Sequence, residues 1–303
     1  MGMIDRVSYI SKNKWVKTQA LTTEEYQTLR QNYGLPADLL TYVTDQDEGP
    51  NYVYDDKSKD ELLIIHVPNL IDQAHLQYMT TPVSFLRHQG MLFTFNESGL
   101  SQVEGLFAQA QQAGVKTIDQ FILHVLFAMM DSYIPLVKAI TKKRNQLDKF
   151  LNQQAKNRDL VALSYLQQTL TFFSSAGQSN LDLLQHLPAT HFGEASNREK
   201  QERLEDVIIE ARQVQRMIVI ENRVVDRISA TFDSIINNNL NDTMKVLTIW
   251  SLSMAVPTII TGFYGMNMHL PLAKQPLAWL LVIGLSVILI GAMLITLRLH
   301  HKM

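Results

Sequence analysis

Two apolar runs close to the C-terminal end constrain the fold of this chain more than any other feature. The first run spans Val246 to Tyr264 and is broken only by small or hydroxyl residues, and the second spans Leu277 to Leu297 without a charge. Each is about as long as a helix must be to cross a bilayer core of roughly 30 Å. Because only residues 265–276 separate them, the chain is predicted to end in a hairpin of two transmembrane helices.

The first of these helices is predicted to be polar along one face. Steps of three, four and seven residues bring small and polar side chains together on that face, namely Asn241, Thr248, Ser251, Ala255, Thr258 and Gly262. Polar groups at membrane depth are costly unless they face protein or water. The face has two interpretations: close packing between helices, which small residues permit, or the wall of a pore. By itself the face favours packing.

Charge and composition limit the classes of function. The chain has no cysteine, which excludes disulfides and thiolate metal sites. Residues 1–120 carry a net charge of −6 and residues 121–303 a net charge of +4. An acidic N-terminal part argues against nucleic acid as a partner and is compatible with cations. The first twenty residues are polar and charged, unlike a signal peptide.

The flanking charges predict the orientation of the hairpin. Lys245 precedes the first span, whereas Arg298 and Lys302 follow the second. The connecting segment contains one basic residue, Lys274. Because basic residues concentrate on the cytoplasmic side of membrane spans, both termini are expected in the cytoplasm, with the protein in the cell membrane.

The N-terminal part is predicted to be a mixed α+β domain. Helices are expected from Thr22 to Asn32, where threonines and glutamates provide a start signal, and from Pro36 to Tyr42. Short apolar runs bounded by turn residues predict six strands, at residues 7–10, 15–20, 51–54, 62–67, 82–87 and 91–95.

From Gly99 onward the pattern is helical. Helices are predicted at 99–112, from Thr117 through Ile140 with a kink at Pro135, and at 158–187. The sequence then contains no glycine or proline between Glu194 and Pro257. A single helix from Glu194 to Gly262 would be about 100 Å long. Its charged face is typical of a solvated surface, and its apolar seam is typical of a bundle of several chains.

These patterns divide the chain into seven segments. We predict an α/β cytoplasmic domain and antiparallel helices, followed by a stalk helix, a first transmembrane helix, an external loop, a second transmembrane helix and a cytoplasmic tail. Their ranges are 1–120, 121–193, 194–245, 246–264, 265–276, 277–297 and 298–303.

Two motifs at the ends of the first span change the balance between packing and pore. The span begins with Asn241-x-x-Met244-Lys245-Val246-Leu247-Thr248 and ends with Tyr264-Gly265-Met266-Asn267. Together with the large N-terminal part, the long helix and the two spans, these motifs resemble the CorA family of magnesium transporters. The resemblance covers the plan of the whole chain.

The resemblance implies a homopentameric funnel that passes Mg²⁺ or another divalent cation, driven by the membrane potential. Gly265, Met266 and Asn267 would form the selectivity filter, with Asn267 and the Gly265 backbone contacting the ion. The polar face of the first span would line the pore, and Met244 and Leu247 would form an apolar constriction within it. No organic cofactor is implied.

The resemblance also implies a regulatory cation site between neighbouring subunits. Counting back from the glycine–methionine–asparagine motif places Asp206 at the family's acidic position on the stalk, with Asp119 as a candidate partner from the N-terminal part. Internal Mg²⁺ would then act as the regulatory ion as well as the cargo. The alternative is that Asp206 pairs with basic residues of its own helix.

Other functions stay open from the sequence. Zn²⁺, Co²⁺ and Ni²⁺ are alternative cargoes, since the external segment 268–276 lacks the acidic residue that many family members carry there and contains Lys274. A membrane-anchored scaffold or sensor is the second hypothesis. An enzyme is not expected, because the chain contains no phosphate-binding glycine loop, nucleophile elbow or zinc-protease helix.

Overall fold

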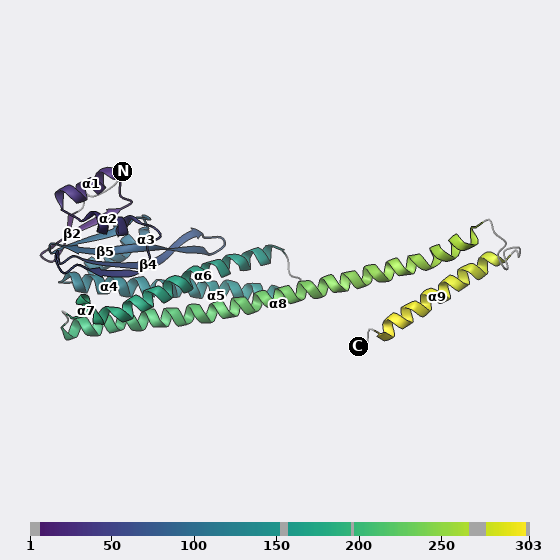
Figure 1. Ribbon diagram of the computed structural model, residues 1–303. Helices are drawn as coiled ribbons and strands as arrows, with labels where there is room; N and C mark the ends of the chain where they lie inside the picture. Colours follow the sequence, from purple (N-terminus) through teal and green to yellow (C-terminus); the bar gives the residue numbers. More distant parts are fainter. Residues whose placement is uncertain (1–6, 152–156, 195–196, 267–276, 301–303) are drawn as a thin grey trace. The chain divides into compact units, whose positions relative to one another are not determined.

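The computed structural model describes residues 7–151, 157–194, 197–266 and 277–300. The chain divides into two compact units, Met1–Ala230 and Thr231–Met303. The first unit contains a mixed sheet flanked by helices, and the second contains the end of a very long helix followed by one more helix. The expected fold class, an α+β domain continued by a long helix and a C-terminal hairpin, is confirmed for the single chain (Figure 1).

The first unit is built on one six-stranded sheet in the order β1-β2-β6-β5-β4-β3. Among the described strands only β2 and β6 pair in parallel, with Trp15 opposite Leu92; the other neighbours are antiparallel. The strands are β1 (Val7–Ile10), β2 (Asn13–Gln19), β3 (Asn51–Tyr54), β4 (Glu61–Asp72), β5 (Gln77–His88) and β6 (Met91–Asn96).

The hairpin of β4 and β5 is longer than the sequence pattern predicted. Both strands continue past the buried part of the sheet, as far as Asp72 and Gln77, where the side chains become more exposed. The backbone N–H of Tyr78 donates to Thr169 Oγ1 at 3.0 Å, and that hydroxyl donates to the Leu76 carbonyl at 3.1 Å. A helix distant in sequence therefore holds the end of the hairpin, which a local pattern cannot reveal.

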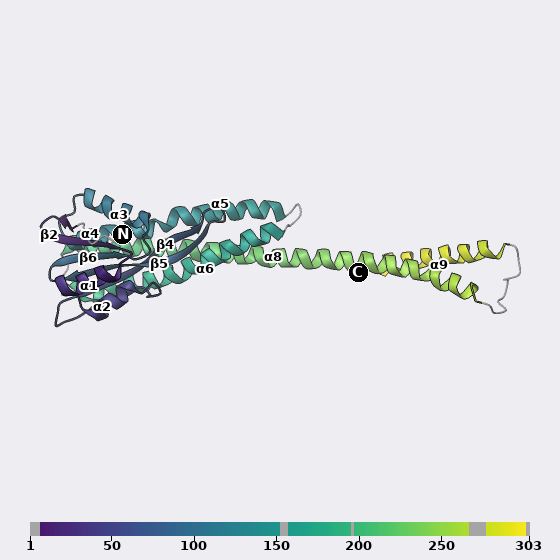
Figure 2. The ribbon, with the colours of Figure 1, turned by 90° about the horizontal axis from the view of Figure 1, so that it is seen from above.

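Helices cover both faces of the sheet (Figures 1 and 2). On one face lie α1 (Thr23–Asn32) and α2 (Ala37–Thr44), whose Leu29 and Leu40 share a core with Leu62 and Ile64 of β4. Residues 62–65 are apolar and buried without a break, because a strand covered on both sides has no solvated face.

Aromatic side chains fill the opposite face of the sheet. Trp15 of β2 contacts Phe107 of α3 (Ser101–Gln112) and Phe121 of α4 (Ile118–Asp131), with ring centroids 5.9 and 4.5 Å apart. Phe85 of β5 packs edge-on against Phe107 at 6.0 Å. These aromatic contacts fix the start of α4 against the sheet.

Sequence signals for helix starts are mostly confirmed, with two corrections. Thr22 and Glu25 form a reciprocal capping box at the start of α1. The expected helix through Pro135 instead divides at Ser132 into α4 and α5 (Tyr133–Leu151). Proline is tolerated in the first turn of a helix, where no intrahelical N–H bond is required, so Pro135 lies near a helix start rather than at a kink.

The long helix begins later than expected. After α6 (Asn157–His186), η1 (Leu187–Ala189) and α7 (His191–Glu194), α8 runs from Arg198 to Tyr264. The side chain of Asn197 accepts from the Lys200 N–H at 2.9 Å, which marks the new helix start. Glu194 therefore belongs to the short helix α7 and not to α8.

Within the first unit, α5, α6 and the first part of α8 pack side by side (Figures 1 and 2). Glu221 of α8 pairs with Arg144 of α5 at 2.8 Å and accepts from Thr141 at 3.0 Å. Gln215 of α8 donates to Gln178 of α6 at 3.1 Å. The apolar seam of the stalk was expected to pack in a bundle of several chains, but it is already buried within the first unit of one chain. Its buried residues are Leu204, Val207, Ala211, Val214, Ile218 and Val225.

The second unit consists of the last part of α8 and α9 (Ala278–His300), which runs back in the opposite direction (Figure 1). Among the described residues, two helical stretches are long and apolar enough to cross a membrane, Ile118–Lys149 and Arg198–Tyr264. More than half of the apolar window of the first is buried, so this stretch, which belongs to α4 and α5, is part of the core of the first unit. None of the window in α8 is buried, so that helix presents its apolar surface outward. The described apolar stretch of α9 is Val282–Thr296.

Candidate ion-conduction site and charge network of the first unit

The sequence-predicted pore face lies on one continuous helix. Residues 241–262 all belong to α8, so the helical spacing that was inferred from the sequence is present along the whole face. Met244 is 55% exposed and Leu247 is 59% exposed. None of the apolar window of α8 is buried within the described chain, and its polar face requires either further copies of the chain or water.

Hydroxyl groups on this helix are positioned by the helix itself. Thr248 Oγ1 donates to the Met244 carbonyl and Thr258 Oγ1 donates to the Met254 carbonyl, both at 2.8 Å. A hydroxyl group that donates a hydrogen bond still has lone pairs on its oxygen that can accept one. These oxygens can therefore face a cation, or the water around it, while each hydroxyl keeps its hydrogen bond to the backbone carbonyl.

One polar residue on this face was missed by the sequence analysis. Asn237 lies one helical turn before Asn241 and is exposed. The i, i+4 spacing from Asn241 was the available signal, but the neighbouring Asn238 and Asn239 obscured it. Asn239 lies on the opposite side of the helix, because two residues correspond to more than half a turn.

The end of α8 carries the first part of the proposed filter. Gly265 N–H donates to the Thr261 carbonyl at 2.9 Å, and a Cβ added to Gly265 would lie 3.2 Å from that carbonyl oxygen. Glycine therefore suits this tight helix end. Met266 follows and is exposed. Asn267 and the remainder of the external loop, 267–276, lie outside the described residues.

The candidate regulatory residue Asp119 lies in a charge network inside the first unit. Its carboxylate contacts Arg87 of β5 and Lys200 of α8, the latter at 3.0 Å. Burial by itself raises the pKa of the Asp119 carboxyl, but the two cations outweigh burial and hold the pKa below its ordinary value. Asp119 is thus neutralised within its own chain.

The network continues into the sheet. Arg87 also pairs with Glu61 of β4 at 3.2 Å, and Glu61 accepts a 2.6 Å hydrogen bond from the Tyr52 hydroxyl. Burial, followed by the Glu61 carboxylate, raises the pKa of Tyr52. Tyr52 in turn accepts from the Phe192 N–H at 3.0 Å. Alternating charges from β4, β5, α4 and α8 therefore join the start of the stalk to the sheet.

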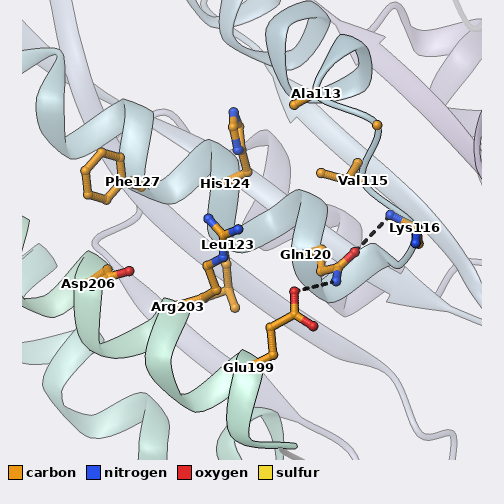
Figure 3. Close-up of a pocket in the computed structure, with 11 residues that line it drawn as sticks. Ala113, Val115, Lys116, Gln120, Leu123, His124, Phe127, Glu199, Arg203 and Asp206 are labelled. Atoms are coloured by element: carbon orange, nitrogen blue, oxygen red, sulfur yellow. Dashed lines mark hydrogen bonds between the residues drawn. The ribbon is translucent and has the colours of Figure 1, made fainter.

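Asp206 lies elsewhere on α8. It is exposed and lines a cavity of about 630 Å³ between α4, the loop before it and α8 (Figure 3). Basic and acidic groups share this cavity: Lys116, His124 and Arg203 on one hand, Glu199 and Asp206 on the other. Glu199 accepts from Gln120 at 3.1 Å. Asp119 does not line this cavity, so one chain does not bring the two candidate aspartates into one site.

Within the described residues, no group of three or more histidine or acidic side chains is arranged to hold a metal ion. Asp206 has no ion pair among the described residues of its own chain, so the expected alternative, pairing along its own helix, is not seen there. The described residues of one chain therefore do not complete a cation site at Asp206.

Comparison with known proteins gives a consistent result over nearly the whole chain. The family model described as "CorA-like Mg²⁺ transporter protein" matches residues 11–299. The cobalt/magnesium transport protein CorA of Methanocaldococcus jannaschii is 25% identical over 287 residues, which cover 91% of this chain and 87% of that protein.

Solved structures show the same fold. The complete CorA magnesium transporter of Methanocaldococcus jannaschii matches with a TM-score of 0.78 at 23% identity, over 97% of this chain and 93% of that one. The full-length CmaX protein matches at 0.64 and 18% identity, over 94% and 88%. The ZntB cytoplasmic domain from Vibrio parahaemolyticus matches at 0.60 and 15% identity, over 77% and 90%.

Proposed function

The chain belongs to the CorA family of Mg²⁺ transporters, and from that premise we propose that it conducts Mg²⁺ through a pore formed by several copies of α8. The observation that supports this most directly is the outward-facing polar stripe on α8, from Asn241 to Gly262, in a stretch otherwise apolar. A membrane anchor needs no such stripe, whereas a pore does.

Five copies around one axis form the pore. A single hairpin cannot enclose a channel, and cyclic symmetry turns each residue of the stripe into a ring. Mg²⁺ gives up its water reluctantly. Rings of neutral asparagine and threonine oxygens, as at Asn241 and Thr258, therefore suit a hydrated ion, because they hydrogen-bond to its water without holding the ion too tightly to leave.

Asn267 is the outer selectivity residue. Its short side-chain carbonyl and the Gly265 backbone receive the ion at the outer end of the pore, and Met244 and Leu247 form an apolar gate at the inner end. Narrow apolar rings can close to ions by losing their water. This assignment is supported by the exposure of both gate residues on α8.

The membrane potential drives transport. About 2.3 kcal/mol per charge per 100 mV corresponds to roughly 4.6 kcal/mol for a divalent cation moving inward. The large first unit and both termini lie in the cytoplasm, where Lys245 flanks the first span. No nucleotide hydrolysis is required.

Intracellular Mg²⁺ regulates the pore through Asp206. An aspartate without an ion pair in its own chain is available for a cation bound between neighbouring copies. For Asp119 to share that cation, Mg²⁺ must compete with Lys200, which already contacts the carboxylate at 3.0 Å. Protease protection by millimolar Mg²⁺ in wild type, and its loss in Asp206→Ala, tests this role; equal protection of both excludes it.

Ion uptake into liposomes that contain only this protein tests the proposed function. Mg²⁺ uptake is expected in wild type and lost in Asn267→Ala, while assembly is unchanged. Ser253→Ala is the matched control, since Ser253 lies on the opposite side of α8 from the stripe. Comparison of Mg²⁺, Co²⁺, Ni²⁺ and Zn²⁺ in the same vesicles identifies the preferred cargo. Normal uptake by Asn267→Ala contradicts the pore.

A further inference from the structure

The first part of α8 has an outward side that its own chain leaves uncovered. Opposite the buried seam lie Ile209 and Ile220, which are 51% and 61% exposed, together with Arg212 and Arg216. Their spacing of three and four residues places them on one side of the helix. We call these four residues the basic strip. Neither arginine has an ion pair among the described residues.

A second surface has the opposite charge. Phe127 of α4 is 40% exposed, and Asp131 ends the same helix. Glu210 of α8 lies close enough to Asp131 that burial and then the Asp131 charge raise the pKa of Glu210. Within the part of the chain that the structure describes, neither carboxylate has a cation partner. We call Phe127, Asp131 and Glu210 the acidic patch.

Two like charges beside an exposed aromatic ring are unfavourable when left alone. A neighbouring arginine relieves the repulsion, and its stem covers the ring. The basic strip offers these complementary groups, with isoleucines to pack against Phe127. Charge complementarity between the two surfaces thus identifies a second copy of this chain as the occupant.

The two surfaces lie on different sides of α8. From Glu210 to the middle of the basic strip the direction changes by about 100° around the helix axis. In a twofold dimer the same surface of both copies forms the contact. Contact between the basic strip and the acidic patch instead joins two different surfaces. Strip-to-patch contact is heterologous, and repeated around an axis it closes into a ring.

We propose that the basic strip of one copy packs on the acidic patch of the next and forms the cytoplasmic interface of the ring. This inference rests on the proposed function, since it names the partner that the pore requires. Asp206 lies one turn from Glu210 on the same side of α8, so the regulatory cation would bind at the edge of this interface.

Cysteine cross-linking of the full-length protein in mild detergent tests the interface directly, because the natural chain has no cysteine. In the double variant Phe127→Cys/Ile209→Cys, a short bifunctional maleimide is expected to give a ladder of bands up to the full ring. Each single variant is expected to give none. The control pair is Tyr42→Cys/Ile209→Cys, since Tyr42 is exposed on α2, across the sheet.

Charge reversal makes the test specific. Arg212→Glu/Arg216→Glu, added to the cross-linking pair, is expected to abolish the ladder, because like charges then face each other. Adding Asp131→Arg/Glu210→Arg to that variant is expected to restore it. Restoration distinguishes a direct contact from local misfolding.

The failure of this interface and the failure of the proposed function give different results. If native mass spectrometry shows an oligomer and uptake is normal but no ladder forms, the interface is overturned and the pore stands. Dimers from the single variants overturn it as well, since they show a twofold contact. If anionic lipid vesicles protect the cysteine of Ile209→Cys from the maleimide and no ladder forms, the basic strip binds lipid, and the proposed interface is overturned. Monomers without uptake contradict the pore itself.

Discussion

At the scale of single residues, the chemistry of this protein depends on which polar groups are already satisfied within the chain. The hydroxyls of Thr248 and Thr258 donate hydrogen bonds to backbone carbonyls of α8, and their oxygens can still accept from the water around an ion. Asp119, in contrast, is occupied by Arg87 and Lys200. From residue type alone, the threonine hydroxyl oxygens and the Asp119 carboxylate oxygens are both possible ligands of a cation. Their partners in the structure show that only the Asp119 oxygens are already occupied by cations.

Asn237 and Asn239 form a matched pair for the pore. Asn237→Ala is expected to slow Mg²⁺ uptake severalfold, because it removes a ring of amide oxygens from the conducting face. Asn239→Ala is expected to leave uptake within a factor of two, since that side chain lies on the far side of α8. Uptake by reconstituted vesicles at equal protein density is the measurement. Equal effects of the two substitutions would show that the face is assigned wrongly.

Asp119 is expected to make stability depend on acid. Since its folded pKa is lowered, its contribution is present above the unfolded value of about 3.9 and is lost as the pH falls through the folded value. Asp119→Asn should therefore lower the free energy of unfolding by about 2 kcal/mol at neutral pH, and the difference from wild type should shrink below about pH 4. Urea unfolding followed by circular dichroism at several pH values provides the comparison, and a constant difference down to pH 2 contradicts this assignment.

At the scale of elements, α8 combines a packed first part with an uncovered last part. Glu221 is 5% exposed and pairs with Arg144 across the contact with α5. Gly177 of α6 sits where an added Cβ would lie 2.5 Å from Gln215 Oε1, so α6 approaches α8 closely. These contacts hold the stalk in a fixed register against the first unit.

Glu221→Ala is expected to destabilise the first unit by about 3 kcal/mol, because it leaves the Arg144 charge buried without a partner. The control is Glu202→Ala. Glu202 pairs with Arg198 on the same helix, and both side chains are more than half exposed, so its removal should cost less than about 1 kcal/mol. Thermal unfolding of the full-length variants in one detergent measures both. Similar losses for the two variants would rule out a special role for the buried pair.

At the scale of the whole molecule, the polar stripe and the two charged surfaces each remain incomplete in one chain. A stripe of polar groups in an apolar helix is costly unless it faces protein or water, and the proposed strip-to-patch contact gives each copy a neighbour on both sides. The proposed pore and the proposed strip-to-patch contact therefore both call for several copies of the chain.

Transport is expected to follow the membrane potential and to need no ATP. An inside-negative diffusion potential of about 100 mV contributes roughly 4.6 kcal/mol to the inward movement of a divalent ion, so Mg²⁺ entry into vesicles should accelerate when valinomycin and a potassium gradient impose it. Asn267→Ala vesicles serve as the control for leakage. Uptake that stays unchanged across potentials of either sign would argue against a passive channel.

The sequence by itself determined the features that are local or one-dimensional. The length of the apolar runs predicted the C-terminal hairpin, and helical spacing placed Asn241 and Thr258 on one face of α8. The motif at Gly265, Met266 and Asn267 pointed to the family. Hydrophobic length and helical period act within one element, so they can be read without knowing what packs against it.

Only the tertiary structure decided which groups meet across the chain. Asp119 is 32 residues from Arg87 and still further from Lys200, and Glu221 is 80 residues from Thr141. The extension of the β4–β5 hairpin likewise depends on a contact with a distant helix. Whether a carboxylate can bind an ion depends on its neighbours in space, and packing of the sheet, α4 and α8 selects those neighbours.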